Sequence, residues 1–99
     1  MYYLTQQSID GFQAIYNNEF GLRDKFVDYW DHLSVKFANN PHVIGYDPLN
    51  EPFFGNPFGH PTDAIPGYFD RHGLAPLFTE INKVYEKNDS TSMMWFEPV

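Results

Sequence analysis

The sequence predicts an α/β fold in the form of a partial (β/α)8 barrel, with the order helix, strand, helix, strand. Two stretches, residues 22–38 and 74–87, have the apolar spacing of amphipathic helices, and short apolar runs follow them at 43–49 and 92–97. A strand, a crossover helix and a second strand form a parallel unit. Because two parallel strands alone leave open edges and a complete barrel needs about 250 residues, we expect these 99 residues to be one piece of a larger barrel or sheet.

The first 21 residues carry no sustained apolar period. Asp10-Gly11 and Asn17-Asn18 are turn signals. We therefore predict that residues 1–21 are mostly loop, with one short helical turn around residues 12–16.

The first predicted helix covers residues 22–38. Its apolar residues recur at spacings of four, four, three and four: Leu22, Phe26, Trp30, Leu33 and Phe37. This stripe is one face of an amphipathic helix, with Trp30 in the core. The helix should stop at Asn39-Asn40-Pro41, because the residue before a proline avoids helical backbone angles.

The first predicted strand covers residues 43–49. In Val43-Ile44-Gly45-Tyr46 both the odd and the even positions are apolar, so both faces of the strand would be apolar. This is typical of a parallel strand that is covered on both faces. Pro48 cannot donate a ladder hydrogen bond, so we expect a bulge near the end of the strand.

A long segment with several prolines and glycines, residues 52–67, separates this strand from the second helix. Loops of this length inside compact domains are usually functional or disordered, and we predict an active-site loop. The second helix, residues 74–87, admits Pro76 only in its first turn. The second strand, residues 92–97, closes on Glu97-Pro98.

Composition limits the classes of partner. A net charge of −7 argues against nucleic acid. Cysteine is absent, and no apolar run reaches the roughly 18 residues of a membrane span. The beginning of the chain does not read as a signal peptide, although the chain can be the interior of a longer protein. The histidines share no metal-ligand spacing, so we predict no metal and no cofactor; they are His32, His42, His60 and His72.

Both predicted strands end in Glu-Pro, at Glu51 and Glu97. In parallel barrels the carboxyl ends of the strands build the active site. A carboxyl group that is partly desolvated there can stay protonated and act as a general acid. The amide of Asn50 could bond a substrate hydroxyl. The alternative is that Glu51 is a solvated residue or a helix-cap partner, since Asn-Glu-Pro alone is a weak motif.

Three longer stretches resemble the family 5 glycoside hydrolases. "NNPHVIGYDPLNEPFFGNP" is similar to the fourth-strand segment of that family. "PGYFDRHGLAPLFTEINKVYEKNDSTSMMWFEPV" is similar to the following helix and fifth strand of its endoglycoceramidase branch and glucosylceramidase-like relatives. "FGLRDKFVDYWDHLSVKFANN" resembles the helix before strand four. The resemblance covers about residues 12–99, and it implies a secreted or lysosome-like location.

The resemblance implies roles for two residues. Glu51 matches the acid/base of a retaining hydrolase, and Asn50 matches the amide that bonds the sugar 2-hydroxyl. The substrate implied is a glycosphingolipid or a related β-glucoside. Retention needs a second carboxylate about 5 Å away, which the family carries on strand seven. Glu97 can approach Glu51, because neighbouring strands lie about 4.8 Å apart. It could then act as the nucleophile. A place in the cleft wall beside Glu51 agrees better with the family. We therefore expect the chain alone to be inactive; the alternative is a non-catalytic fragment or a carbohydrate-binding remnant.

Two further features leave alternatives open. Trp95 is expected to pack against a helix, with a sugar-stacking platform as the alternative. The aromatic residues of the long loop, Phe53, Phe54 and Phe58, could fold the loop onto itself or line a lipid site. Asn88-Asp89-Ser90 fits the N-glycosylation pattern, which matters only in a secreted protein.

Overall fold

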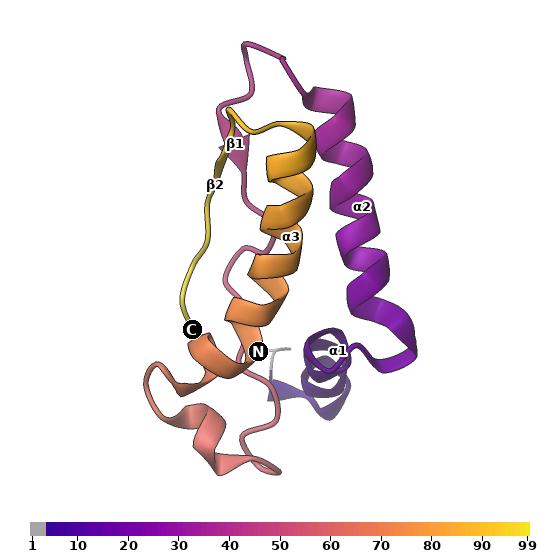
Figure 1. Cartoon of the computed structure of the whole chain (residues 1–99). Helices are drawn as coiled ribbons and strands as arrows, with labels where there is room; N and C mark the ends of the chain where they lie inside the picture. Colours follow the sequence, from indigo (N-terminus) through magenta and orange to yellow (C-terminus); the bar gives the residue numbers. More distant parts are fainter. Residues whose placement is uncertain (1–3) are drawn as a thin grey trace.

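The computed structural model describes residues 4–99, in which helices lie beside a small two-stranded parallel sheet (Figure 1). The α-helices are α1 (Gln6–Tyr16), α2 (Leu22–Phe37) and α3 (Ala75–Asn88), and the strands are β1 (Gly45–Tyr46) and β2 (Met93–Met94). Short helical segments connect them: η2 (Glu19–Gly21), η3 (Pro61–Ala64) and the π-helical η4 (Asp70–Leu74). The arrangement is a mixed α/β one, with a small parallel sheet.

Helix α1 corrects the prediction that residues 1–21 are mostly loop. Thr5 caps the helix, because its hydroxyl oxygen accepts a hydrogen bond from the Ser8 amide at 3.4 Å. The helix buries Ile9, Ala14 and Tyr16. This burial outweighs the cost of Gly11 in a helix interior, which is on the order of 1 kcal/mol.

Helices α2 and α3 coincide with the two apolar stripes. Helix α2 ends at Phe37, one residue before the predicted end, and α3 is shifted by one residue from the predicted range 74–87. The buried face of α3 supplies the centre of the core, with Leu77 and Ile81 fully buried. Pro76 lies in the first turn of α3, and the π-helical η4 runs directly into that turn.

Strands β1 and β2 pair in parallel, as predicted, with Tyr46 opposite Met94. Two ladder bonds flank this pair: Met93 N–H donates to the Ile44 carbonyl at 3.2 Å, and Trp95 N–H donates to the Tyr46 carbonyl at 2.8 Å. The strands are much shorter than the predicted ranges 43–49 and 92–97. Pro48 explains part of this, since it has no N–H to donate and the chain bends from residue 48 onward.

Helices cover one face of the sheet only. On that face the ring of Tyr46 stacks on Tyr85 at 4.7 Å between centroids and meets Trp30 edge-on at 6.2 Å. On the other face Met93 and Trp95 are 54% and 50% exposed. The prediction that both faces are buried is therefore wrong for this chain, because nothing within residues 4–99 covers the second face.

The dimensions agree with an uncovered sheet. The radius of gyration is 14.4 Å, against about 13 Å for a compact domain of this length. Among residues 4–99 no helix combines the length and the apolar character that crossing a membrane requires.

Candidate functional site

The carboxyl ends of the two strands bring the predicted acids together. Because β1 and β2 are parallel, the chain leaves both strands in the same direction (Figure 1). The backbone N–H of Glu51 donates a hydrogen bond to the Oε2 atom of Glu97 at 2.9 Å. The two Glu-Pro corners are therefore joined, although they lie 46 residues apart in the sequence.

The backbone of Glu51 has an unusual conformation. Its φ is +46°, in the left-handed region that residues other than glycine rarely adopt. Such a conformation costs on the order of 1–3 kcal/mol and is found most often at active sites and ligand clamps. The carboxylate of Glu97 and the buried Pro52 hold this corner in place.

The surroundings of Glu51 differ from those expected. Glu51 was predicted to lie partly desolvated in a cleft, but its side chain is exposed, as is that of Asn50. Glu97 is half-buried. The physical reason is the open side of the sheet, which leaves the carboxyl end of β1 facing solvent.

Helix α1 holds the loop that follows Glu51, a role that the sequence did not predict. The Tyr16 hydroxyl donates to the Phe53 carbonyl at 2.8 Å, and the backbone N–H of Asn56 donates to Oε1 of Gln13 at 2.9 Å. Phe12 adds a ring contact with Phe53 at 6.1 Å between centroids. Burial raises the pKa of Tyr16 far above its usual value, so its hydroxyl remains a donor. The spacing of Ile9, Phe12 and Tyr16 is a signal for the helix itself, but nothing local indicates that the helix holds this loop.

The loop aromatics divide between the two predicted roles. Phe53 and Phe54 stack at 4.7 Å between centroids, and Phe54 packs against the core. Both residues therefore help to fold the loop. Phe58 is 78% exposed and is the loop phenylalanine that faces solvent.

Trp95 does not pack against a helix, contrary to the prediction. Its indole lies over Gly45 on the uncovered face of the sheet, where a Cβ atom at position 45 would come 2.7 Å from Nε1 and would also collide with the Met93 carbonyl. Gly45 is therefore required by the close approach of β2 and Trp95.

A cavity of about 460 Å³ adjoins the acidic corner, between α3 and the segment that follows β2. Its lining is mainly apolar and includes Glu97; the other lining residues are Asp70, Leu74, Ala75, Phe78, Thr79, Asn82, Met94, Phe96 and Pro98. Within the described part of the chain, no group of three acidic or histidine side chains is arranged to hold a metal ion.

Comparisons with known proteins find two relatives named endoglycoceramidase. It is 40% identical over 98 residues to an endoglycoceramidase of Hydra vulgaris and 38% identical over 98 residues to one of Cyanea nozakii. These matches cover 99% of this chain but 19% and 20% of the two relatives, so the chain spans about a fifth of their length. No family model matches the sequence, and no solved structure matches it. The two relatives support a glycoside hydrolase-like origin for this chain.

Proposed function

We propose that this chain is the part of an endoglycoceramidase-like retaining glycoside hydrolase that carries the acid/base residue, Glu51. The observation that carries the proposal is the meeting of Glu51 and Glu97 at the carboxyl ends of two parallel strands, in a chain that resembles endoglycoceramidases along its whole length. In this proposal β1 and β2 are strands four and five of a family 5 (β/α)8 barrel. The substrate class is glycosphingolipids or related β-glucosides.

In the proposed mechanism Glu51 acts twice. Its carboxyl group first protonates the glycosidic oxygen as the aglycone departs, and its carboxylate then takes a proton from the water that hydrolyses the glycosyl-enzyme. Asn50 donates its side-chain amide to the 2-hydroxyl of the sugar at the scissile bond. The nucleophile belongs to a part of the barrel outside this chain.

Glu97 is a positioning residue in this proposal. Its Oε2 atom already accepts the Glu51 amide proton, and this bond fixes the strained corner from which the acid/base projects. A carboxylate committed to the backbone of its neighbour is a poorer nucleophile than a free one. This contact favours the cleft-wall role over the nucleophile role.

The rest of the barrel is the partner that we propose for the uncovered sheet face. On this face Met93 and Trp95 are 54% and 50% exposed. Contiguous exposed apolar side chains mark surfaces that another element covers. The same cover would withdraw Glu51 from solvent, which a general acid at neutral pH requires.

A chimera tests the function directly. This chain replaces the aligned 98 residues of the Hydra vulgaris endoglycoceramidase, and hydrolysis of a glycosphingolipid is measured with and without Glu51→Gln. We expect the native chimera to be active and the Glu51→Gln chimera to lose roughly 10²–10⁴-fold in kcat/KM. The isolated chain should be inactive.

The leaving group provides the control. The dinitrophenolate leaving group of a dinitrophenyl glycoside needs no protonation. Glu51→Gln should therefore slow formation of the glycosyl-enzyme from this substrate far less than from the glycolipid. Glu19→Gln, at an exposed position far from Glu51 in the sequence, should leave both rates unchanged. Full activity of the Glu51→Gln chimera towards the glycolipid would show that the acid/base assignment is wrong.

A further inference from the structure

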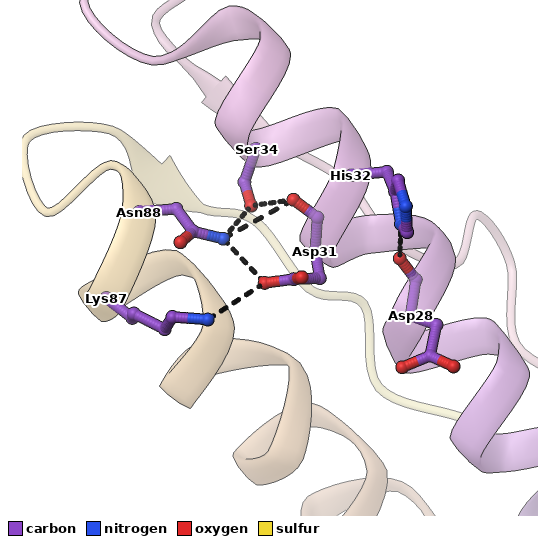
Figure 2. A network of polar contacts seen from close by, with 6 residues as sticks. All are labelled: Asp28, Asp31, His32, Ser34, Lys87 and Asn88. Carbon is purple, nitrogen blue, oxygen red and sulfur yellow. Dashed lines mark hydrogen bonds and ion pairs between the residues drawn. The ribbon is translucent and has the colours of Figure 1, made fainter.

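The amide nitrogen of Asn88 is surrounded by acceptors. Asn88 is the last residue of α3, and its Nδ2 atom donates to Oδ1 of Asp31 at 2.8 Å, to Oγ of Ser34 at 3.0 Å and to the Asp31 carbonyl at 3.3 Å. Figure 2 shows these contacts between α3 and α2. The two N–H groups of the side chain are thus directed at α2.

The partners of Asn88 are themselves held in place. Ser34 is completely buried, and its hydroxyl donates to the Asp31 carbonyl at 3.0 Å. The Lys87 ammonium lies 3.6 Å from Oδ1 of Asp31 (Figure 2). We call Asn88 with Asp31, Ser34 and Lys87 the Asn88 clamp. It joins the C-terminal end of α3 to the C-terminal half of α2.

The residue after Asn88 is tied to the sheet. Asp89 is 6% exposed, and its carboxylate accepts hydrogen bonds from the Tyr46 hydroxyl at 2.8 Å, from Ser92 at 2.6 Å and from Thr91 at 3.2 Å. Ser90 is exposed. The triplet 88–90 therefore fixes α3 to α2 through its first residue and to β1 through its second.

The same triplet is the one Asn-x-Ser/Thr sequence in the chain. Glycan attachment transfers an oligosaccharide from a lipid-linked diphosphate donor to Nδ2: the anomeric carbon–oxygen bond breaks, a carbon–nitrogen bond forms, the amide loses one proton, and the lipid diphosphate leaves. The product carries a bulky sugar in place of one amide hydrogen. In the folded chain both hydrogens are engaged, and three oxygen atoms lie within 3.3 Å of the nitrogen.

We propose that folding closes this glycosylation site: Asn88 accepts a glycan only while α2 and α3 are apart, and the Asn88 clamp excludes the glycan once they pack. Attachment of a glycan and formation of the clamp are mutually exclusive. A glycan at Asn88 would mark chains that have not folded.

The test uses the whole chain, translated behind a signal sequence with microsomes that supply the lipid-linked donor. Glycan is detected as a mass shift that peptide N-glycosidase removes, in the protease-resistant and protease-sensitive fractions separately. We expect no glycan on the native chain in the protease-resistant fraction. Ile81→Asp, which places a charge at a fully buried core position, should prevent folding and allow glycan at Asn88.

Two matched variants control the assay. Glu19→Thr turns Asn17-Asn18-Glu19 into an acceptor at an exposed asparagine and should yield one glycan on folded chain. Ser90→Ala removes the native acceptor and should abolish the glycan of the Ile81→Asp chain. Glycan at Asn88 in the protease-resistant native chain would overturn the proposal. So would an Ile81→Asp chain that remains unmodified, because local sequence rather than folding would then control the site.

Discussion

The two ends of the sheet differ in whether their polar side chains are hydrogen-bonded within the chain or exposed to solvent. At the amino end, the side chains of Asn88 and Asp89 each make three hydrogen-bonded contacts within the chain. At the carboxyl end, the side chains of Asn50 and Glu51 are exposed, and the contact that joins the two corners uses the backbone of Glu51. Polar groups that complete their bonding inside the chain contribute to stability, whereas groups directed at solvent can serve a ligand. The amino end should therefore dominate stability and the carboxyl end activity.

The largest effect on stability in this comparison is expected for Asn88→Ala. It removes the donor of the Asn88 clamp and leaves the fully buried Ser34 hydroxyl oxygen without that partner. We expect a loss of about 1–2 kcal/mol in the free energy of unfolding, measured by urea denaturation. Ser90→Ala, two residues away and exposed, is the matched control and should change little. Equal effects of the two substitutions would contradict the clamp.

A smaller loss is expected for Tyr46→Phe. The ring keeps its contacts with Trp30 and Tyr85, but the hydrogen bond to Asp89 is lost. Burial and the neighbouring Asp89 carboxylate raise the pKa of Tyr46 to about 12, so its hydroxyl is a donor throughout the neutral range. Thermal unfolding should report a cost of about 1 kcal/mol. An unchanged melting temperature would show that the Tyr46–Asp89 bond contributes nothing to stability.

Acid should weaken the amino end selectively. Hydrogen bonds from Asn88, and then the Lys87 charge, lower the pKa of Asp31; bonds from Ser92 and Tyr46 lower that of Asp89. A lowered carboxyl pKa gives stability that is present above the unfolded value, 3.8, and is lost as the pH falls through the folded value. Urea midpoints should therefore fall below about pH 4. In Asn88→Ala the urea midpoint should depend less on pH than in the native chain. The same pH dependence in both chains would argue that Asn88 does not lower the pKa of Asp31.

The smallest effect on stability is expected for Glu51→Gln. The side chain is exposed, and the bond to Glu97 uses the backbone N–H, which the substitution preserves. The free energy of unfolding should stay within about 0.5 kcal/mol of the native value, while glycolipid hydrolysis in the chimera falls by orders of magnitude. A large loss of stability in urea would mean that Glu51 is a structural residue.

The sequence predicted the parts of the fold that a repeated apolar pattern determines. The stripes of α2 and α3 and the parallel pairing of the strands that follow them were readable because each extends over several residues. Helix α1 was predicted only as one short turn around residues 12–16, because Asp10-Gly11 resembles a turn, whereas the helix is stabilised by burial of Ile9, Ala14 and Tyr16. The shortness of β1 was only partly predictable, from Pro48, which has no N–H to donate.

Of the candidate site, only the proximity of its two acidic residues could be predicted from the sequence. The repeated Glu-Pro ending indicated that Glu51 and Glu97 would lie near each other, and their hydrogen bond agrees with this. The positive φ of Glu51 and the anchoring of the loop by Gln13 and Tyr16 had no local signal, because each depends on groups more than 35 residues away. The exposure of Glu51 follows from the uncovered sheet face rather than from its neighbours in sequence.

The attachment of the loop to α1 has a consequence for motion. The carbonyl of Phe53 and the amide of Asn56 are both bound by side chains of the same helix. When α1 unfolds locally, both hydrogen bonds are lost together. The backbone of residues 53–56, which follow Glu51, should therefore become mobile in a single step. In amide hydrogen exchange, Asn56 and the interior of α1 should therefore exchange as one cooperative unit, and a ligand that orders this loop should slow exchange in a helix that it does not touch.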